Sequence, residues 1–313
     1  MVGAELVAPL AEALTSATGY ALAEKSARTR NEYRSALEKF VAWCECVGAA
    51  AFPAMPETVA AHLASLADRG LSASTIEGRA AAIAYAHKLA REPNPLGDER
   101  VRAVLRGIRR TIGAPARGKA PATAKIVASF VKTAPDSMKG KRDRALLLLC
   151  FGAALRRSEL VALDVSCIER ADGGAIVSIR RSKTDQEGRG QEVAVPAGKK
   201  LKVIEALDAW LSASGIASGP LFRAVDKAGK VGAARLNGRT VGRIVKDYAT
   251  RAGLDASAFG AHSLRSGFIT SALEAGADVL KVMDVSRHRE IGSLKKYDKR
   301  AQAFKTAAGK GFL

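Results

Sequence analysis

The segment from Ile112 to Ala124, IGAPARGKAPATA, constrains the fold of this chain more than any other feature of the sequence. It combines Gly, Pro and Ala with two basic residues, a composition typical of an exposed linker between domains. At 313 residues the chain is long enough for two domains that each bury an apolar core. We therefore expect an N-terminal domain of residues 1–111, a linker of residues 112–124 and a C-terminal domain of residues 125–313.

Residues 1–111 repeat apolar side chains at helical spacing, which predicts a small all-helical domain. A first helix is expected near residues 26–48, and others near 57–69, 72–90 and 98–111. The first helix should bury one stripe, and the third should turn Leu89 inward together with Ile76, Ile83 and Ala86. The stripe expected on the first helix consists of Tyr33, Leu37, Phe40, Val41 and Cys44.

Beyond the linker, helical patterns alternate with one β segment. Two short runs rich in Ile and Val, near 175–181 and 191–195, are joined by polar and glycine residues and predict a hairpin with Lys183 at its mouth. Gly253 and Gly276 are placed where helices should stop. The whole chain is therefore expected to be mainly α with a small β-sheet. The helices expected here cover residues 199–214, 240–252, 263–275 and 278–286.

Composition excludes several classes of protein. The longest uninterrupted apolar run, ALLLLCF at Ala145 to Phe151, is far shorter than the roughly 20 residues that span a bilayer. The N-terminus lacks the basic start of a signal peptide. The four cysteines show neither paired spacing nor a histidine pattern typical of zinc. We expect a protein of the cytoplasm, associated with the nucleoid, with reduced thiols, no metal and no cofactor.

A formal charge of +19 indicates a polyanionic partner, because neutralising phosphates releases condensed counterions. Residues 1–118 contain 15 Lys and Arg against 12 Asp and Glu, whereas residues 119–313 contain 35 against 19. Aromatic residues make up only 5% of the chain, which disfavours stacking of single-stranded bases on exposed rings. Double-stranded DNA is the expected partner.

Candidate catalytic residues occur in a fixed order along the C-terminal domain. Arg156 and Glu159 lie in LRRSEL, His262 and Arg265 in HSLR, and Tyr297 lies nine residues after His288 in a run of Lys and Arg. Each piece has an ordinary interpretation, such as an internal Arg–Glu pair or a solvated basic face. Together with Lys183 in the hairpin, however, the set supplies a nucleophile, phosphate ligands and proton donors.

This ordered set resembles the tyrosine recombinases, also called phage integrases, over roughly residues 25–300. The resemblance implies a helical, SAM-like core-binding domain and an α+β catalytic domain that form a C-shaped clamp on DNA. It also assigns the roles of the site residues. Tyr297 would be the nucleophile, Arg156 and Arg265 would stabilise the transition state, Lys183 would be the general acid, His262 would assist proton transfer, His288 would hydrogen-bond the phosphate, and Glu159 would support the site by fixing His262 or its own helix.

The resemblance further implies strand exchange at a specific duplex site, with inverted repeats, through a 3′-phosphotyrosyl intermediate and a Holliday junction. Four subunits would assemble on DNA, each docking the C-terminal tail that carries Phe304, Phe312 and Leu313 into a neighbour; a frayed terminus is the alternative. Basic residues on the outer faces of the N-terminal helices are expected to contact DNA. These are Arg34, Lys39, Arg79, His87, Lys88, Arg106 and Arg110.

Two other functions remain open at this point. A type IB topoisomerase would share the active-site chemistry but relax supercoils, and a DNA-binding regulator could retain the fold without catalysis. The absence of long insertions disfavours the first, and the full set of catalytic residue types disfavours the second. The sequence leaves open whether Tyr297 acts in its own subunit or in the next.

Overall fold

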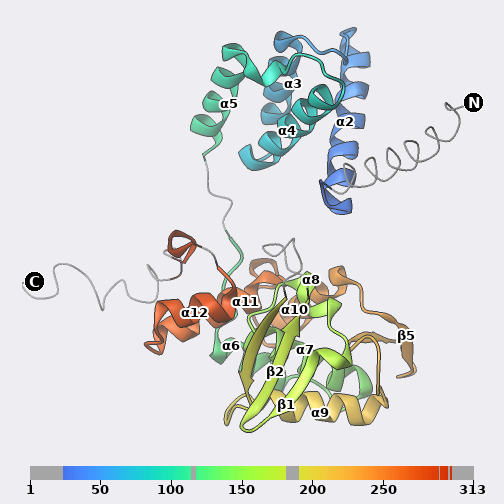
Figure 1. The fold of residues 1–313 in the computed structure, drawn as a ribbon, viewed down its shortest axis with the longest axis vertical. Helices are drawn as coiled ribbons and strands as arrows, with labels where there is room; N and C mark the ends of the chain where they lie inside the picture. The colour runs from blue at the N-terminus through green and yellow to red at the C-terminus, as the bar shows by residue number, and fades with distance from the viewer. Residues whose placement is uncertain (1–23, 114–117, 181–189, 289, 295–296, 298–313) are drawn as a thin grey trace, which may run out of the picture. The chain divides into compact units, whose positions relative to one another are not determined.

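A computed structural model of the chain describes residues 24–113, 118–180, 190–288, 290–294 and 297 (Figure 1). The chain divides into two compact units, Met1–Gly118 and Lys119–Leu313. The division falls inside the segment expected to be a linker. The two units are described separately below.

The described residues of the first unit form four α-helices, all at the expected places (Figure 1). Three of them begin at a side chain that accepts a backbone N–H of the first turn, and these capping residues are Ser26, Ser72 and Asp98. A short 3-10 turn, Pro95–Gly97, precedes the last helix. The helices are α2 (Ala27–Val47), α3 (Pro56–Asp68), α4 (Ala73–Leu89) and α5 (Glu99–Ile112).

The core of the first unit differs from the expectation at two positions. Val41 and Leu89 are 41% and 66% exposed, so their predicted burial is wrong. On α2 the buried stripe is turned toward Trp43, which packs against the core, and this leaves Val41 at its opposite edge. On α4 the buried side chain of the last turn is His87 instead of Leu89. The inward faces of the helices still meet around Phe40, Cys44, Val59, Leu63, Leu66, Ile76, Ile83 and Val101.

The second unit contains seven α-helices among its described residues, arranged beside two small sheets (Figure 1). The apolar run Ala145–Phe151 lies within α7, which packs against α9, and every side chain of the run is buried. No described helix is long and apolar enough to cross a membrane. The helix expected from residue 199 begins only at Val203, because Lys202 has left-handed backbone angles, φ 45° and ψ 52°. The helices are α6 (Ala124–Lys132), α7 (Met138–Gly152), α8 (Arg157–Ala162), α9 (Val203–Ser214), α10 (Gly238–Arg251), α11 (His262–Glu274) and α12 (Val279–Ser286).

The expected hairpin is present as β2 (Gly174–Ile179) paired antiparallel with β3 (Gln191–Pro196). Two further features were not predicted. Strand β1 (Ile168–Ala171) adds to β2 and completes a three-stranded sheet, and β4 (Arg223–Val225) pairs with β5 (Val231–Arg235) in a separate sheet. Both escaped prediction because most of their residues are exposed, so they lack the alternation of apolar and polar residues that marks a half-buried strand.

The end of the expected linker is part of the second unit, so its description as exposed is wrong for these residues. Ala122 is fully buried, and its N–H donates to the carbonyl of Ser263 at 2.8 Å. The backbone of Ala122 passes so close to Gly267 that a Cβ there would lie 1.8 Å from the Ala122 carbonyl oxygen. The entering chain is therefore fixed beside α11.

Candidate active site

Arg156 follows a break in the chain between α7 and α8. Helix α7 ends at Gly152, and Ala154 has a left-handed φ of 46°. Arg156 then caps α8, where its backbone N–H donates to Glu159 Oε2 at 2.8 Å and its Nη1 donates to Glu159 Oε1 at 2.6 Å. The expected Arg156–Glu159 pair is therefore present. It holds the side chain of Arg156 at the start of a short helix.

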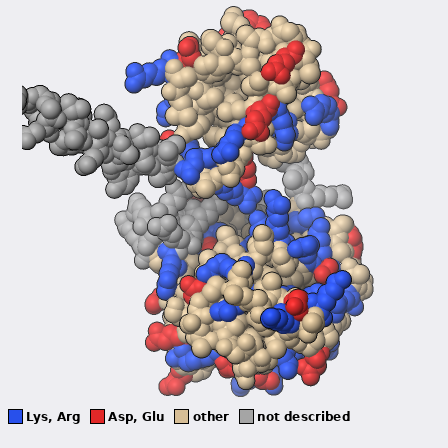
Figure 2. Space-filling view, turned by 90° about the vertical axis from the view of Figure 1, so that its right-hand side faces the viewer, with Lys and Arg blue, Asp and Glu red and all other residues tan. Residues whose placement is uncertain are grey.

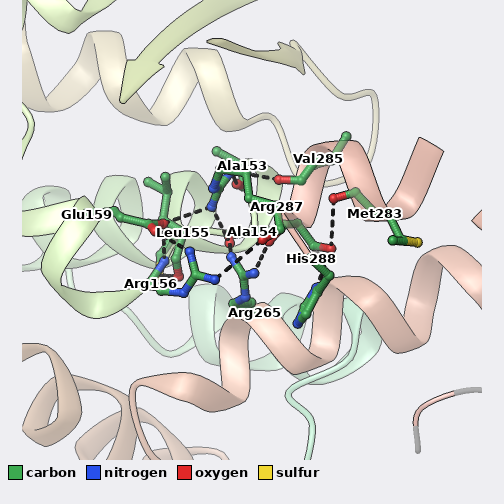
Figure 3. Close-up of polar contacts among 12 residues, drawn as sticks. Ala153, Ala154, Leu155, Arg156, Glu159, Arg265, Met283, Val285, Arg287 and His288 are labelled. Carbon is green, nitrogen blue, oxygen red and sulfur yellow. Dashed lines mark hydrogen bonds and ion pairs between the residues drawn. The ribbon is translucent and has the colours of Figure 1, made fainter. Parts of the chain in front are cut away.

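Arg265 lies on α11 and is 1% exposed. Its Nη1 donates to the carbonyl of Ala154 at 2.7 Å, and its Nη2 donates to the carbonyl of Ser286. These two acceptors belong to the turn before Arg156 and to the end of α12. Arg265 thus joins the segments that carry Arg156 and His288 (Figure 3).

A third arginine, Arg287, completes this cluster and was missed by the sequence reasoning. Its Nη2 donates to Glu159 Oε2 at 2.9 Å and to the carbonyl of Ala154 at 2.8 Å, and Figure 3 shows its side chain between Glu159 and Arg265. The residue was treated as one member of a solvated basic run. Its position directly after the apolar helix VLKVMDVS and directly before His288 was the available signal.

The electrostatics of this cluster favour an anion. The cluster holds three guanidinium groups and one carboxylate: Glu159 pairs with Arg156 and Arg287, Arg265 donates to backbone carbonyls, and no other carboxylate contacts the three groups in the described part of the chain. Burial would raise the pKa of Glu159, but Arg287 and Arg156 outweigh it and hold that pKa below its usual value. Burial, followed by the charges of Arg156 and Arg287, lowers the pKa of Arg265 to about 9. A bound phosphate would relieve this excess positive charge.

The histidines of the expected site lie on the elements that carry these arginines. His288 follows Arg287, is half-buried, and its Nδ1 lies 2.7 Å from the hydroxyl of Ser286. His262 begins α11, one turn before Arg265, and is exposed. The contacts of Glu159 fix the start of α8, which is one of the two supports expected of it. Lys183 lies outside the described residues.

Tyr297 lies in the same unit as the arginine cluster. Its half-buried side chain packs against a small apolar core formed by α11, α12 and Leu294, and its N–H donates to the Leu294 carbonyl at 2.8 Å. α11 also carries Arg265. The residues of that core are Ile269, Leu273, Val282 and Leu294.

The residues expected to contact DNA from the first unit have different environments. Arg79 is half-buried. His87 is 1% exposed, and its Nε2 accepts the N–H of Ala54 at 2.9 Å, so its assignment to a DNA-contacting surface is wrong. His87 lies on α4, and its ring packs against that of Phe52, with the two ring centroids 4.8 Å apart. This contact contributes to the burial of His87. The remaining residues, Arg34, Lys39, Lys88, Arg106 and Arg110, are exposed.

Lys and Arg side chains also gather on the second unit, over the upper part of its face in Figure 2. This distribution agrees with the excess of basic residues counted in residues 119–313. The described residues contain no group of three His, Cys, Asp or Glu side chains placed to hold a metal ion.

Comparison with solved structures shows a fold shared with DNA recombinases. A lambda integrase dimer bound to a core site matches with a TM-score of 0.60 and 18% identity, covering 88% of this chain and 72% of that one. The XerH site-specific recombinase in a post-cleavage complex matches with a TM-score of 0.57 and 16% identity, covering 82% and 72% of the two chains.

Sequence relatives place the chain within a family. A sequence model of the phage integrase family matches residues 122–303 of this chain. An integrase/recombinase XerD homolog of Selenomonas ruminantium is 34% identical over 292 residues, which are 91% of this chain and 85% of that protein. The recombinase Cre of Escherichia phage P1 is 27% identical over 287 residues, 84% of this chain and 81% of Cre. The chain belongs to the phage integrase family, and it is an enzyme of the tyrosine recombinase class.

Proposed function

We propose that this enzyme cleaves and rejoins duplex DNA at a specific site through a covalent 3′-phosphotyrosyl intermediate on Tyr297. One observation carries the proposal: three buried or half-buried arginines lie together with a single carboxylate, which pairs with two of them, in the same unit as Tyr297. The excess positive charge of this cluster favours the binding of a phosphate. The tyrosine can then act as the nucleophile. A purely structural ion-pair network would be expected to balance its charges.

In this proposal Tyr297 attacks the scissile phosphorus and its phenol proton is lost. The bond from phosphorus to the 5′-oxygen breaks, leaving a 3′-phosphotyrosine and a free 5′-hydroxyl. The phosphotyrosine is again a phosphodiester, so the energy of the broken bond is retained. A 5′-hydroxyl from a second duplex can therefore reverse the step without an external energy source.

Arg156 and Arg265 bind the non-bridging oxygens, and their planar guanidinium groups stabilise the charge that develops in the five-coordinate transition state. His288 donates a hydrogen bond to the same phosphate from Nε2, since its Nδ1 lies 2.7 Å from the hydroxyl of Ser286. His262 receives the phenol proton, and Lys183 protonates the departing 5′-oxygen. Glu159 holds Arg156 in place.

Strand exchange requires two such reactions on each of two duplexes. We therefore propose a tetramer on DNA, a Holliday-junction intermediate and a target with inverted repeats, to which both units bind. The tail after Tyr297, expected to link subunits, lies outside the described residues. The net charge of +19 supports a DNA-bound assembly.

A pool of nicked duplexes with randomised sequence tests this function. The nick lets the short 5′-hydroxyl strand diffuse away, so a cleaved site is trapped as a protein–DNA adduct that survives denaturation. We expect the wild-type protein to yield an adduct enriched in one sequence, and Tyr297→Phe to yield none. This substitution removes one hydroxyl and keeps the ring that packs on α11 and α12.

The alternatives predict other results. A regulator would bind duplexes from the pool without any adduct. A topoisomerase would form adducts with little sequence enrichment, relax plasmids that lack the enriched sequence and give no recombinant products. Either result would contradict the proposed function.

A further inference from the structure

Arg287 is a buried cation to which the proposed reaction assigns no role. It follows α12 directly, is 5% exposed and has left-handed backbone angles, φ 56° and ψ 45°. Burial of a guanidinium and a left-handed backbone at a residue other than glycine are both unfavourable. The contacts that the side chain makes must therefore offset these costs.

Those contacts join two turns that are far apart in the sequence. Nη1 donates to the carbonyls of Val285 at 2.6 Å and Ala153 at 3.2 Å. Nη2 donates to the carbonyl of Ala154 at 2.8 Å and to Glu159 Oε2 at 2.9 Å. Arg287 thus ties the end of α12 to the turn between α7 and α8 (Figure 3).

Each of the two phosphate-binding arginines shares an acceptor with Arg287. Arg265 Nη1 donates at 2.7 Å to the same Ala154 carbonyl, and Arg156 Nη1 donates at 2.6 Å to the same Glu159 carboxylate. Arg156 Nη2 also lies 3.5 Å from the backbone carbonyl of Arg287 itself. The positions of both guanidinium groups therefore depend on acceptors that Arg287 holds.

Stability alone does not account for a guanidinium at this position. Arg287 Nε is buried and has no acceptor within the described part of the chain, and an unpaired buried donor is destabilising. Glu159 would still pair with Arg156 if Arg287 were apolar. Removing one partner of a buried ion pair is destabilising mainly because it leaves a charge uncompensated, and here Glu159 would keep Arg156.

We propose that Arg287 is a positioning residue for strand cleavage: through Glu159 and the Ala153–Ala154 turn, it holds Arg156 and Arg265 at the spacing that binds two oxygens of one phosphate. It donates to protein acceptors and does not contact the phosphate itself. This inference rests on the proposed function for its chemical consequence, but its structural part is independent of that function.

The chemical consequence is tested by the rate of adduct formation at saturating DNA. The probe is a nicked duplex with the sequence that the wild-type protein enriches from the randomised pool. Arg287→Met should slow the reaction about 100-fold, because small displacements of reacting groups have effects of that size. Arg287→Lys keeps the charge but not the planar fork, and should slow it about 10-fold. The apparent Kd for the duplex should not change in either variant.

Arg235 provides a matched control in the same unit. It also ties two carbonyls and one carboxylate, those of Val161, Leu163 and Asp164, but at the opposite end of α8. Arg235→Met should change the cleavage rate by less than about twofold. The double variant Glu159→Gln/Arg287→Met should slow adduct formation by less than the product of the factors by which the two single variants slow it. Both residues act on Arg156, so their effects are not independent.

The guanidinium NMR signals of Arg156 and Arg265 test the structural part without DNA. Both groups should rotate slowly about the Nε–Cζ bond in the wild type and in Arg235→Met, and faster in Arg287→Lys and Arg287→Met. Unchanged signals, or a wild-type cleavage rate in Arg287→Met, would overturn the proposal. If Arg287→Met does not fold, Arg287→Lys decides the question by the same two measurements. A wild-type protein without any adduct would instead contradict the proposed function, and the NMR comparison would still decide whether Arg287 positions the other two arginines.

Discussion

At the scale of single residues, the candidate site contains groups that orient the expected catalytic side chains through hydrogen bonds. Ser286 is one of these, since its hydroxyl lies 2.7 Å from His288 Nδ1 and also 3.5 Å from the carbonyl of Met283. In the proposed reaction, this contact would turn Nε2 of His288 toward the phosphate. Ser286 thus has a role that its neighbours in the sequence do not indicate.

Ser286→Ala should lower the rate of adduct formation about 10-fold, because the ring of His288 loses the contact that orients it. The affinity for duplex DNA should be unchanged. Ser129→Ala is a suitable control, since Ser129 likewise donates to the carbonyl three residues earlier but lies on α6. Equal rates in Ser286→Ala and the wild type, measured on the same nicked duplex, would show that this contact is unimportant for cleavage.

Several residues of the site could be predicted from the sequence, since Arg156 and Glu159 are three positions apart and pair across one turn. Arg287 could not be predicted in this way. Its partners Ala154 and Glu159 lie more than a hundred residues earlier, and its backbone conformation is set by the end of α12. Burial at such a position depends on tertiary contacts, which the local pattern of charges does not contain.

At the scale of elements, helix periodicity was sufficient for the first unit, but polar side chains in its core were not foreseen. His62 of α3 is 1% exposed and lies between the rings of Phe40 and Trp43, each 4.9 Å away. Neither ring nitrogen has a hydrogen-bond partner within the described residues. Burial, together with the charges of Arg79 and Arg69, lowers the pKa of His62 to about 4.

The first unit should therefore lose stability as the pH falls. Above pH 6.5 His62 is neutral in both the folded and the unfolded chain, so it has no effect. Between 6.5 and about 4 only the unfolded chain takes up the proton, which favours unfolding by up to about 3 kcal/mol. Below pH 4 the effect levels off.

Urea unfolding of the full chain, followed by the fluorescence of Trp43 in a Trp210→Phe background, measures this effect. At pH 7 we expect His62→Leu to be at least as stable as the wild type, because the unpaired nitrogens are removed. Its advantage in free energy of unfolding should grow by about 3 kcal/mol between pH 7 and pH 4. An advantage that does not change with pH would show that His62 titrates normally in the fold.

The small strands and the entry segment of the second unit show where prediction by element fails. Strand β1 is mostly exposed, and Ala122 is buried by α11 and not by any pattern in its own sequence. At Gly267 the backbone of α11 lies so close to the backbone of Ala122 that a side chain would clash. No local rule of sequence identifies a glycine inside a helix as such a point of contact.

At the scale of the whole molecule, the arginine cluster and Tyr297 belong to one unit of one chain. Tyr297 packs on the apolar core formed by α11 and α12, and α11 also carries Arg265. This arrangement supports attack by Tyr297 within its own subunit. The sequence left this question open because the distance from Tyr297 to the arginines depends on tertiary structure.

A mixture of two inactive proteins, Tyr297→Phe and Arg265→Lys, distinguishes the two modes of attack. If each subunit uses its own tyrosine, no subunit of the mixture has both groups, and the nicked duplex should give no adduct above the level of either protein alone. If the tyrosine is donated to the next subunit, the mixture should recover adduct on the Arg265→Lys chain. Recovery of that kind would contradict attack within the subunit.

The identity of the covalently modified residue tests the central claim most directly. The denatured adduct is trimmed with nuclease and cleaved after glutamate, which releases residues 291–313, a peptide with Tyr297 as its only tyrosine. We predict that mass spectrometry finds the remaining nucleotide on this peptide, with the fragment ions placing it on Tyr297. A nucleotide attached to any other residue, or an adduct of equal yield in Tyr297→Phe, would contradict the account.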